Sequence, residues 1–384
     1  METAVKKRIA SVDILRCIVM VIMALDHTRD YFSDFKFDPT DFSHTTTALF
    51  FTRWITHYCA PVFVFLSGTS AFLSLGRGKT KKQASFQLLT RGIWLIILEL
   101  TIIRFGWLFN IDYSLVIVQV IWAIGWSMIV LSLLIFLNRQ IIAGIALLMI
   151  FGHNLLDGIH AAQFGGVWWN MLHEQAFIPY GDHNMFAVIY PVIPWIGVMA
   201  AGYCFGAMLQ QDETKRNRQL YWTGGTAIAA FIIIRYLNVY GDMRPWTPGR
   251  GWISFLSFLN TTKYPPSLLY LLMTLGPAIF SMPLLEKLNG KIGSVFSVYG
   301  RVPLFYYILH IYLLHTIAMI TGLFIGLPVS NFTKNDFSFG GATWGFSLPV
   351  VYGYWLLAIA ILYMPCRWFM KVKANSRKWW LSYL

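Results

Sequence analysis

Long apolar stretches separated by short polar connections run through most of the chain. A membrane-spanning α-helix needs about 20 consecutive, mostly apolar residues, and about ten stretches meet that length. The pattern predicts an all-α fold, a polytopic integral membrane helical bundle in one domain over residues 1–366. The predicted spans are roughly 10–32, 48–75, 84–109, 114–137, 140–158, 185–209, 219–239, 265–285, 295–322 and 344–366.

Lysine and arginine residues cluster in alternate connections between these stretches. By the positive-inside rule such connections face the cytoplasm, which predicts that both termini are cytoplasmic. The first apolar stretch is too long for the core of a signal peptide and is expected to remain as a span. The basic clusters are 6–8, 77–82, 215–218 and 367–378, and the longer, less basic connections are 33–47, 159–184, 240–264 and 323–343.

The composition supports a membrane protein. Hydrophobic residues make up 57% of the chain and charged residues 12%, where soluble domains carry about 25% charged residues. A net charge of +13 can indicate nucleic-acid binding, but here the basic residues lie between apolar stretches, so no nucleic-acid partner is expected. The expected partner is instead the lipid bilayer. The basic, aromatic segment 367–384 is expected to form a cytoplasmic tail.

The four cysteines are scattered, which indicates neither a disulfide framework nor a metal site, and no histidine cluster has a clean metal-ligand spacing. We therefore expect no metal cofactor.

The first predicted span carries a polar stripe. An α-helix turns about 100° and rises about 1.5 Å per residue, so Arg16 and His27 lie within about 20° of one another and about 16 Å apart. Asp13 lies close to the same line. Such a stripe must face protein or a water-filled cavity, since lipid would not tolerate it. The alternatives are that Asp13 and Arg16 only pair at the interface, and that His27 marks an ordinary helix end.

Two other predicted spans carry ionisable residues that are candidates for function. Arg53 and His57 are four residues apart and are expected to share a helix face, with His57 either in a pocket or bonded to a neighbouring helix. Arg301 lies near the cytoplasmic end of a late span, and His310 lies near its middle. Histidine can act as a general base or a nucleophile near neutral pH, which favours chemistry on the extracytoplasmic side.

The segment VDILRCIVMVIMALDHTRDYF resembles the first span of the heparan-alpha-glucosaminide N-acetyltransferase-like family of transmembrane acyltransferases. It also resembles the opening of the type 3 acyltransferases that O-acylate bacterial polysaccharides. The shared features are Asp13, Arg16 and His27. Three further segments are similar to motifs of these families: HYCAPVFVFLSGTSAF at 57–72, YPVIPWIGVMAAGYCFG at 190–206 and GRVPLFYYILH at 300–310.

The resemblance implies transfer of an acyl group, with acetyl-CoA or another acyl-CoA as the cytosolic donor. The acceptor would be an amine or hydroxyl of an extracytoplasmic saccharide or glycoconjugate, at a bacterial inner (plasma) membrane. His27 would act as general base or form an acyl-imidazole, oriented by Asp30 or Asp26. His44 competes with His27, because the lysosomal members place their catalytic histidine in the following loop.

Further residues receive expected roles from the same resemblance and from their depth in the bundle. The remaining assignments are His57 as a further catalytic residue, Asp13, Arg16, Arg301, Lys79, Lys81 and Lys82 at the donor, and Arg53, His44 and His310 in the substrate pocket.

Two other functions fit parts of the pattern. Intramembrane charges and a basic inner face would also serve a transporter or flippase for a lipid-linked or anionic solute, although no two related halves are visible. A scaffold would not need buried arginine and histidine residues. A homo-oligomer is compatible with the sequence, which also leaves the acyl chain length and the acceptor open.

Overall fold

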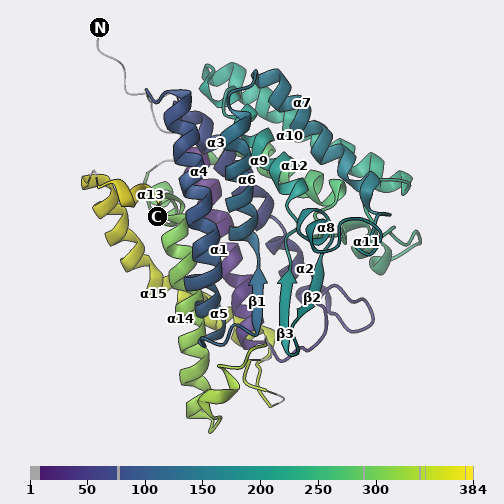
Figure 1. Cartoon of the computed structure of the whole chain (residues 1–384), viewed down its shortest axis with the longest axis vertical. Coiled ribbons are helices and arrows are strands. Elements are labelled where there is room, and N and C mark those ends of the chain that lie inside the picture. The colour runs from purple at the N-terminus through teal and green to yellow at the C-terminus, as the bar shows by residue number, and fades with distance from the viewer. Residues whose placement is uncertain are drawn as a thin grey trace.

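The computed structural model describes residues 9–75, 78–288, 290–336, 339–341, 343–376 and 378–383. The basic residues at 6–8, 77 and 377, which helped to orient the predicted spans, lie outside these ranges. The described chain is mostly helical (Figure 1). Its helices are α1 (Ala10–Phe32), α2 (Thr47–Thr56), α3 (Cys59–Leu75), α4 (Lys81–Leu98), α5 (Arg104–Leu108), α6 (Val120–Leu134), α7 (Arg139–Gly152), α8 (Val167–Leu172), α9 (Ile193–Phe205), α10 (Glu213–Leu237), α11 (Trp252–Leu259), α12 (Leu268–Leu285), α13 (Lys291–Arg301), α14 (Pro303–Phe324) and α15 (Leu348–Asn375), with short helical turns η1 (Glu99–Ile103), η2 (His153–Leu156), η3 (Met208–Gln210), η4 (Val329–Asn331) and η5 (Trp379–Ser382).

Eight helical segments within the described residues are long and apolar enough to cross a membrane, which confirms a membrane protein. Two more expected spans coincide with helices that do not meet both the length and the composition of a membrane span. α1 has 23 residues but carries several charged residues, and α6 is apolar but only 15 residues long. The total of about ten spans therefore stays a prediction. The eight segments are Thr47–Leu75, Lys81–Leu108, Arg139–Leu156, Ile193–Gln210, Glu213–Leu237, Leu268–Leu285, Pro303–Phe324 and Leu348–Asn375.

Proline residues mark breaks in two of the predicted helices. α2 ends at Thr56 and α3 begins at Cys59, because Pro61 cannot donate the backbone hydrogen bond that would continue the helix. The stretch 295–322, predicted as one span, is divided into α13 and α14 around Val302, and Pro303 opens α14. The prediction of one continuous helix there was wrong.

A small sheet accompanies the helices, which the all-α prediction missed. β1 (Leu115–Val118), β2 (Ala176–Tyr180) and β3 (Asn184–Val188) lie in the order β1-β3-β2, with β1 parallel and β2 antiparallel to β3. The predicted helices at 114–137 and 185–209 therefore begin as strands. Val and Ile residues favour strands, and Gly181, at a φ of +61°, permits the turn between β2 and β3.

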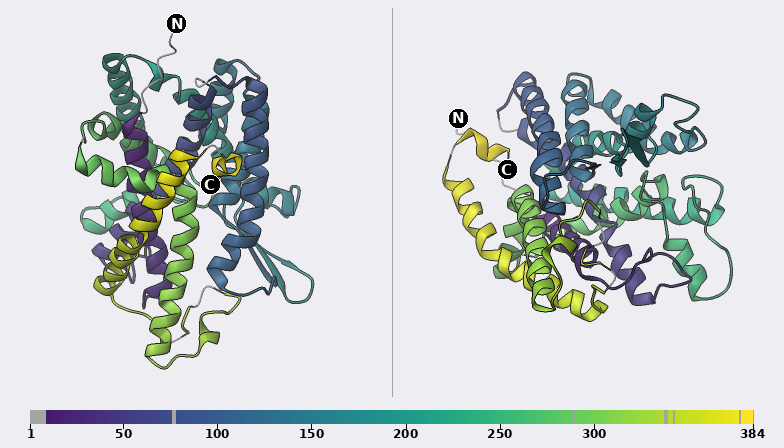
Figure 2. Two further views of the ribbon diagram at one scale, coloured as in Figure 1. Left: turned by 90° about the vertical axis from the view of Figure 1, so that its left-hand side faces the viewer. Right: turned by 60° about the horizontal axis from the view of Figure 1, so that its bottom comes forward.

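α1 lies inside the bundle, packed against α3, α12, α13, α14 and α15. Figure 2 shows α14 running along the bundle with α15 crossing it obliquely. Very close helix contacts depend on glycine, since a Cβ on Gly202 of α9 would lie 2.0 Å from the backbone oxygen of Phe65 in α3. α15 continues to Asn375, so the first part of the predicted tail at 367–384 is helical.

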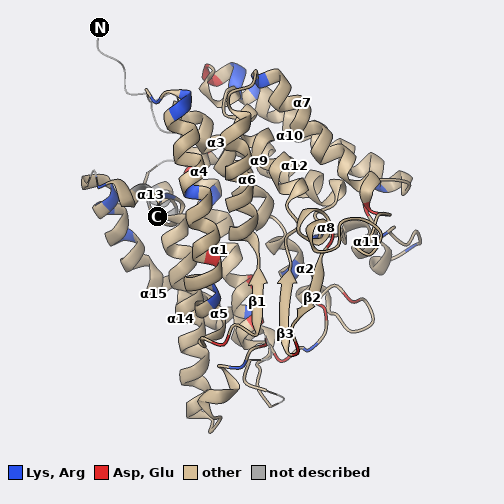
Figure 3. Cartoon of the chain, in the orientation of Figure 1, with Lys and Arg blue, Asp and Glu red and all other residues tan. Residues whose placement is uncertain are grey.

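Charged residues are unevenly distributed along the bundle. In Figure 3, basic residues gather around the starts of α4 and α10, whereas acidic residues are frequent in the loops at the opposite end. This distribution follows the alternation of basic connections in the sequence. α1 runs between the two ends, and each end holds a cavity.

Candidate active site: two cavities along α1

The larger cavity, which we call the His27 cavity, has a volume of about 730 Å³. It surrounds the last part of α1 and is closed by the loop after α1, by β1 and by the segments that precede α9, α12 and α15. Its charged and aromatic lining includes Asp26, His27, Arg29, Asp30, Lys36, Arg53, Trp107, Lys263, Tyr264, Tyr307, Asp336 and Trp344.

The smaller cavity, which we call the Arg16 cavity, has a volume of about 460 Å³ and surrounds the beginning of α1. Five cationic side chains and one carboxylate are among its described lining residues, so an anionic ligand fits it best. The charged residues are Asp13, Arg16, Lys79, Arg91, Arg301 and Lys373.

The same four helices, α1, α3, α6 and α14, contribute residues to both cavities. On α3, Phe63 faces the His27 cavity and Ser67 the Arg16 cavity, so about one helical turn, or 6 Å, separates them there. On α1, the buried Met20 lies between the two ends of the polar stripe. Residues of α1 thus line two cavities, one toward each end of the helix.

His27 forms a hydrogen bond with His310 of α14. The distance from His27 Nδ1 to His310 Nε2 is 2.6 Å, and the two rings are stacked. His310 Nδ1 lies 3.1 Å from the carbonyl oxygen of Tyr306, which can only accept, so Nδ1 of His310 carries a proton. In a neutral pair, His310 Nε2 then accepts the proton of His27 Nδ1. His27 Nε2 keeps its lone pair and is the nitrogen available to the cavity.

The surroundings hold this pair firmly. The sequence analysis predicted that His310 lines the substrate pocket. In the structure, His310 is completely buried and lies behind His27, outside the cavity lining. The rings of Trp107 and Tyr307 meet the His27 ring edge-on, with centroids 4.8 and 6.2 Å away. A ring fixed on three sides offers a base of defined direction, which catalysis requires.

Asp26 is the centre of an ion-pair cluster beside His27. Arg53 of α2 donates to both of its carboxylate oxygens, at 2.9 and 2.7 Å, and Arg29 lies 2.8 Å away. Lys263 lies 3.9 Å from the same carboxylate. The cluster fixes α1 against α2 and the segment before α12, and it places Arg53 in the cavity wall, as expected of a substrate-pocket residue.

Asp30 lines the cavity but does not orient His27. Its carboxylate accepts a hydrogen bond from Arg29 at 2.7 Å, whereas the partner of His27 Nδ1 is His310. The expectation that Asp30 or Asp26 would orient the base is therefore corrected by the geometry.

His57 lies outside the cavity lining, although Thr56 just before it and Cys59 just after it line the wall. The helix break after Thr56 removes the face that His57 was expected to share with Arg53. The carbonyl of His57, which Pro61 cannot engage, accepts a hydrogen bond from Tyr270 at 2.8 Å. Its ring is buried against the Tyr270 ring.

His44, the competing candidate, is exposed in the loop between α1 and α2 and is absent from the cavity lining. Its Nδ1 lies 2.9 Å from a carboxylate oxygen of Asp41. Hydrogen bonds from Ser43 and His44 lower the pKa of the Asp41 carboxyl to about 2, so the loop keeps a stable anion there. The structure thus places His27, and not His44, in the cavity.

The Arg16 cavity brings most of the expected donor residues together. Arg16 lies 3.7 Å from Asp13, donates to Ser70 at 2.9 Å, and lies 3.3 Å from the carbonyl of Gly300. Arg301 lies 4.0 Å from the other oxygen of Asp13. Lys79 also lines the cavity, whereas Lys81 and Lys82 are exposed and outside its lining.

Several lining residues had no clear signal in the sequence. Trp107, Tyr307 and Lys263 enter the His27 cavity from segments far from α1, and Arg91 and Lys373 enter the Arg16 cavity. Glu99, on the same helical segment as Arg91, accepts the backbone N–H of Gln119 at 3.0 Å, at the start of α6. Trp107, Tyr307 and Arg91 were marked in the sequence only by their position within predicted spans, and Lys263 and Lys373 lie in a predicted connection and in the predicted tail.

A helical membrane protein with a fixed histidine ring in a cavity at one end of a helix and a cationic cavity at the other is suited to group transfer. A family model described as heparan-alpha-glucosaminide N-acetyltransferase, catalytic, matches residues 8–240. The match covers more than half of the chain, so the chain belongs to this family of acetyltransferase-type membrane enzymes. No curated protein matches the chain.

Proposed function

We propose that the protein transfers an acyl group, in the first place acetyl, from cytosolic acyl-CoA to an amine or hydroxyl of an extracytoplasmic saccharide or glycoconjugate. The observation that carries this proposal is the His27–His310 pair, which leaves a basic nitrogen at a cavity of about 730 Å³. Membership of an acetyltransferase family supports the reaction class.

His27 Nε2 accepts the proton of the acceptor amine or hydroxyl as that group attacks the thioester carbonyl. The tetrahedral intermediate then collapses, its C–S bond breaks, and the thiolate of CoA leaves with the proton returned by His27. Arg53 and Lys263 belong to the group of cations around Asp26. These cations stabilise the negative charge that develops on the carbonyl oxygen. Attack by Nε2 itself, giving an acyl-imidazole, is the covalent variant of the same step.

The Arg16 cavity is the proposed site of the donor's phosphates, since its arginine and lysine side chains suit phosphate oxygens. The pantetheine arm would lie along the polar stripe of α1, which spans about 16 Å from Arg16 to His27. This placement needs the turn around Met20 to open. It puts the Arg16 cavity on the cytoplasmic side, with both termini there, in agreement with the basic connections.

The proposal is tested on detergent-purified protein by binding of acetyl-CoA, by titration calorimetry, and by release of free thiol. Wild type is compared with His27→Ala, Arg16→Ala and His44→Ala. Wild type should bind and release thiol, faster with an amine-bearing glucosaminide. His27→Ala should bind without release, Arg16→Ala should bind weakly, and His44→Ala should resemble wild type.

A sample quenched during turnover distinguishes direct transfer from transfer through an acyl-imidazole. Acetyl label bound to wild-type protein but absent from His27→Ala supports the acyl-imidazole, whereas its absence from both supports direct transfer. If wild type neither binds acetyl-CoA nor releases thiol, the proposal is wrong, and the two cavities on shared helices would then favour transport of an anionic solute.

A further inference from the structure

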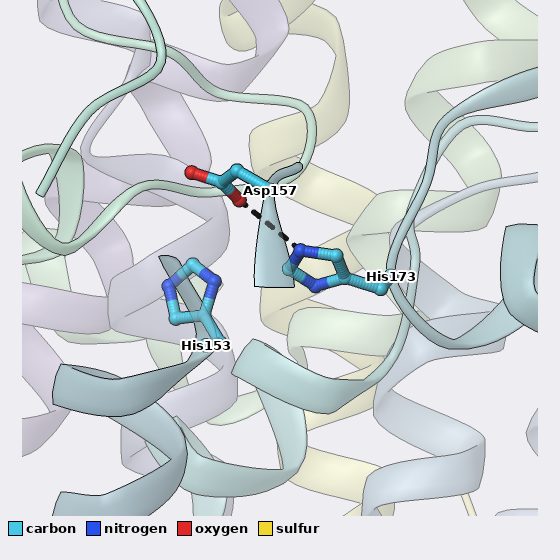
Figure 4. Close-up of side chains that lie close together, drawn as sticks. All are labelled: His153, Asp157 and His173. Atoms are coloured by element: carbon cyan, nitrogen blue, oxygen red, sulfur yellow. Dashed lines mark hydrogen bonds and ion pairs between the residues drawn. The ribbon is translucent and has the colours of Figure 1, made fainter. Parts of the chain in front are cut away.

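We propose that His153, Asp157 and His173 bind a divalent transition-metal ion, with zinc as the best fit. Among the described residues, these three side chains form a group whose ligand atoms all lie within 4.8 Å of one another. Figure 4 shows the two imidazoles and the carboxylate turned toward a common space. The sequence predicted no metal, because sixteen residues separate Asp157 from His173 and give no recognisable spacing.

Local structure brings the three residues together. His153 begins η2 directly after α7, and Asp157 follows directly after the last residue of η2. His173 ends α8, where its ring packs against Trp169. His173 Nε2 already lies 3.1 Å from a carboxylate oxygen of Asp157.

The second observation is a buried imidazole without a partner. His153 is 2% exposed, and neither of its ring nitrogens has a hydrogen-bond partner among the residues that the structure describes. Nδ1 of His173 is also buried and unbonded. A buried polar group without a partner costs about 1–3 kcal/mol in mutational data, so an imidazole is seldom left in that state. A metal ion would satisfy His153 directly.

The donor set and its size fit zinc. Two imidazoles and one carboxylate are borderline and hard ligands, a combination common for Zn²⁺, and a water molecule would complete four-coordination. In a tetrahedral site with bonds of about 2.0–2.1 Å, ligand atoms are about 3.4 Å apart. The His173–Asp157 distance of 3.1 Å is close to this value, and His153 would reach it by a shift of at most about 1.4 Å through side-chain rotation.

Neighbouring residues form the outer layer that metal sites require. Asn154 donates from Nδ2 to the second oxygen of Asp157 at 2.8 Å, which fixes the carboxylate. The oxygen of the same Asn154 side chain accepts the backbone N–H of Leu268 at 2.9 Å, at the start of α12. Lys263 and Tyr264, in the wall of the His27 cavity, lie just before that point. The ion would therefore fix the segment that closes one wall of that cavity.

The test uses full-length protein purified without a histidine tag and without chelators. Metal content is measured by mass spectrometry, and the melting temperature is measured after chelator treatment and again after addition of Zn²⁺. Co²⁺ added to the chelated protein reports coordination through its visible absorption. The variants are His153→Leu and Asp157→Asn, and the matched control is His160→Gln, an exposed histidine in the same loop.

We expect about one ion per chain in wild type and in His160→Gln, and at least about fivefold less in both site variants. Wild type should lose thermal stability with chelator and regain it with Zn²⁺, while the site variants respond to neither. Asp157→Asn keeps the size of the side chain, so it remains informative if His153→Leu does not fold. The proposal is overturned if wild type takes up no Zn²⁺ or Co²⁺, or if the site variants retain as much metal as the control.

Discussion

Replacement of His310 by phenylalanine removes the acceptor of the His27 Nδ1 proton while filling the same space. The donor at His27 would then be buried without a partner, which costs about 1–3 kcal/mol. The imidazole can avoid this cost by placing its proton on Nε2, and in that tautomer it is no longer a base toward the cavity. Since about 1.4 kcal/mol corresponds to a factor of ten, kcat should fall about 5- to 150-fold.

The KM for acetyl-CoA should stay within about twofold, because His310 lies behind His27 and outside both cavity linings. Steady-state thiol release gives both constants. His310→Gln is the partial rescue, since its amide oxygen can accept from His27 Nδ1. His315→Gln is the control, because His315 is equally buried on α14 but bonds to the backbone oxygens of Gly106 and Phe332.

The reasoning is refuted if His310→Phe folds and keeps the kcat of His315→Gln. It is also refuted if His310→Gln and His310→Phe lose activity equally while melting at the same temperature. Either result would mean that the contact of 2.6 Å between the two rings does not set the proton position on His27.

The remaining predictions concern binding and packing. Arg16→Ala should weaken acetyl-CoA binding about tenfold or more, because the charged hydrogen bonds of a cavity arginine are worth about 1.5–3 kcal/mol. The control Lys82→Ala, at an exposed position, should change the affinity less than about twofold. Calorimetry measures both affinities, and equal losses would contradict the assignment of the cavity. Asp26→Asn leaves Arg29 and Arg53 without their shared carboxylate and should destabilise the protein by about 3–5 kcal/mol, seen as a lower melting temperature in detergent. Gly202→Ala should destabilise by about 1–3 kcal/mol, because its Cβ would meet the backbone of α3; Gly144→Ala, with open space around it, should be neutral or stabilising by less than about 1 kcal/mol.

The polar stripe of α1 could be predicted from the sequence because it depends only on helix periodicity. Arg16 and His27 lie where that periodicity puts them, at opposite ends of one helix side, and each lines a cavity. The apolar stretches predicted most of the helices for the same reason, since length and hydropathy decide whether a segment can cross a membrane.

The partner of His27 could not be predicted in this way. His310 lies 283 residues away, and only the packing of α14 against α1 brings the rings together. The prediction that His57 shares a helix face with Arg53 was wrong for a local reason, since α2 ends at Thr56. The strands β1 and β3 were read as parts of apolar helices, because short apolar runs have no period that separates the two.

The candidate site also includes residues beyond the part of the chain that matches the family model. The packing of α13 and α14 against α1 shows how these residues reach the two cavities. The match ends at residue 240, whereas His310 and Arg301 come from α14 and α13. α13 approaches α1 so closely that a Cβ on Gly300 would lie 2.0 Å from the backbone oxygen of Asp13. This contact sets Arg301 beside Asp13 in one cavity, and α14, which follows directly, sets His310 beside His27 in the other. One helix–helix interface therefore controls both the proposed donor site and the proposed base, so a change at Gly300 should disturb binding and chemistry together.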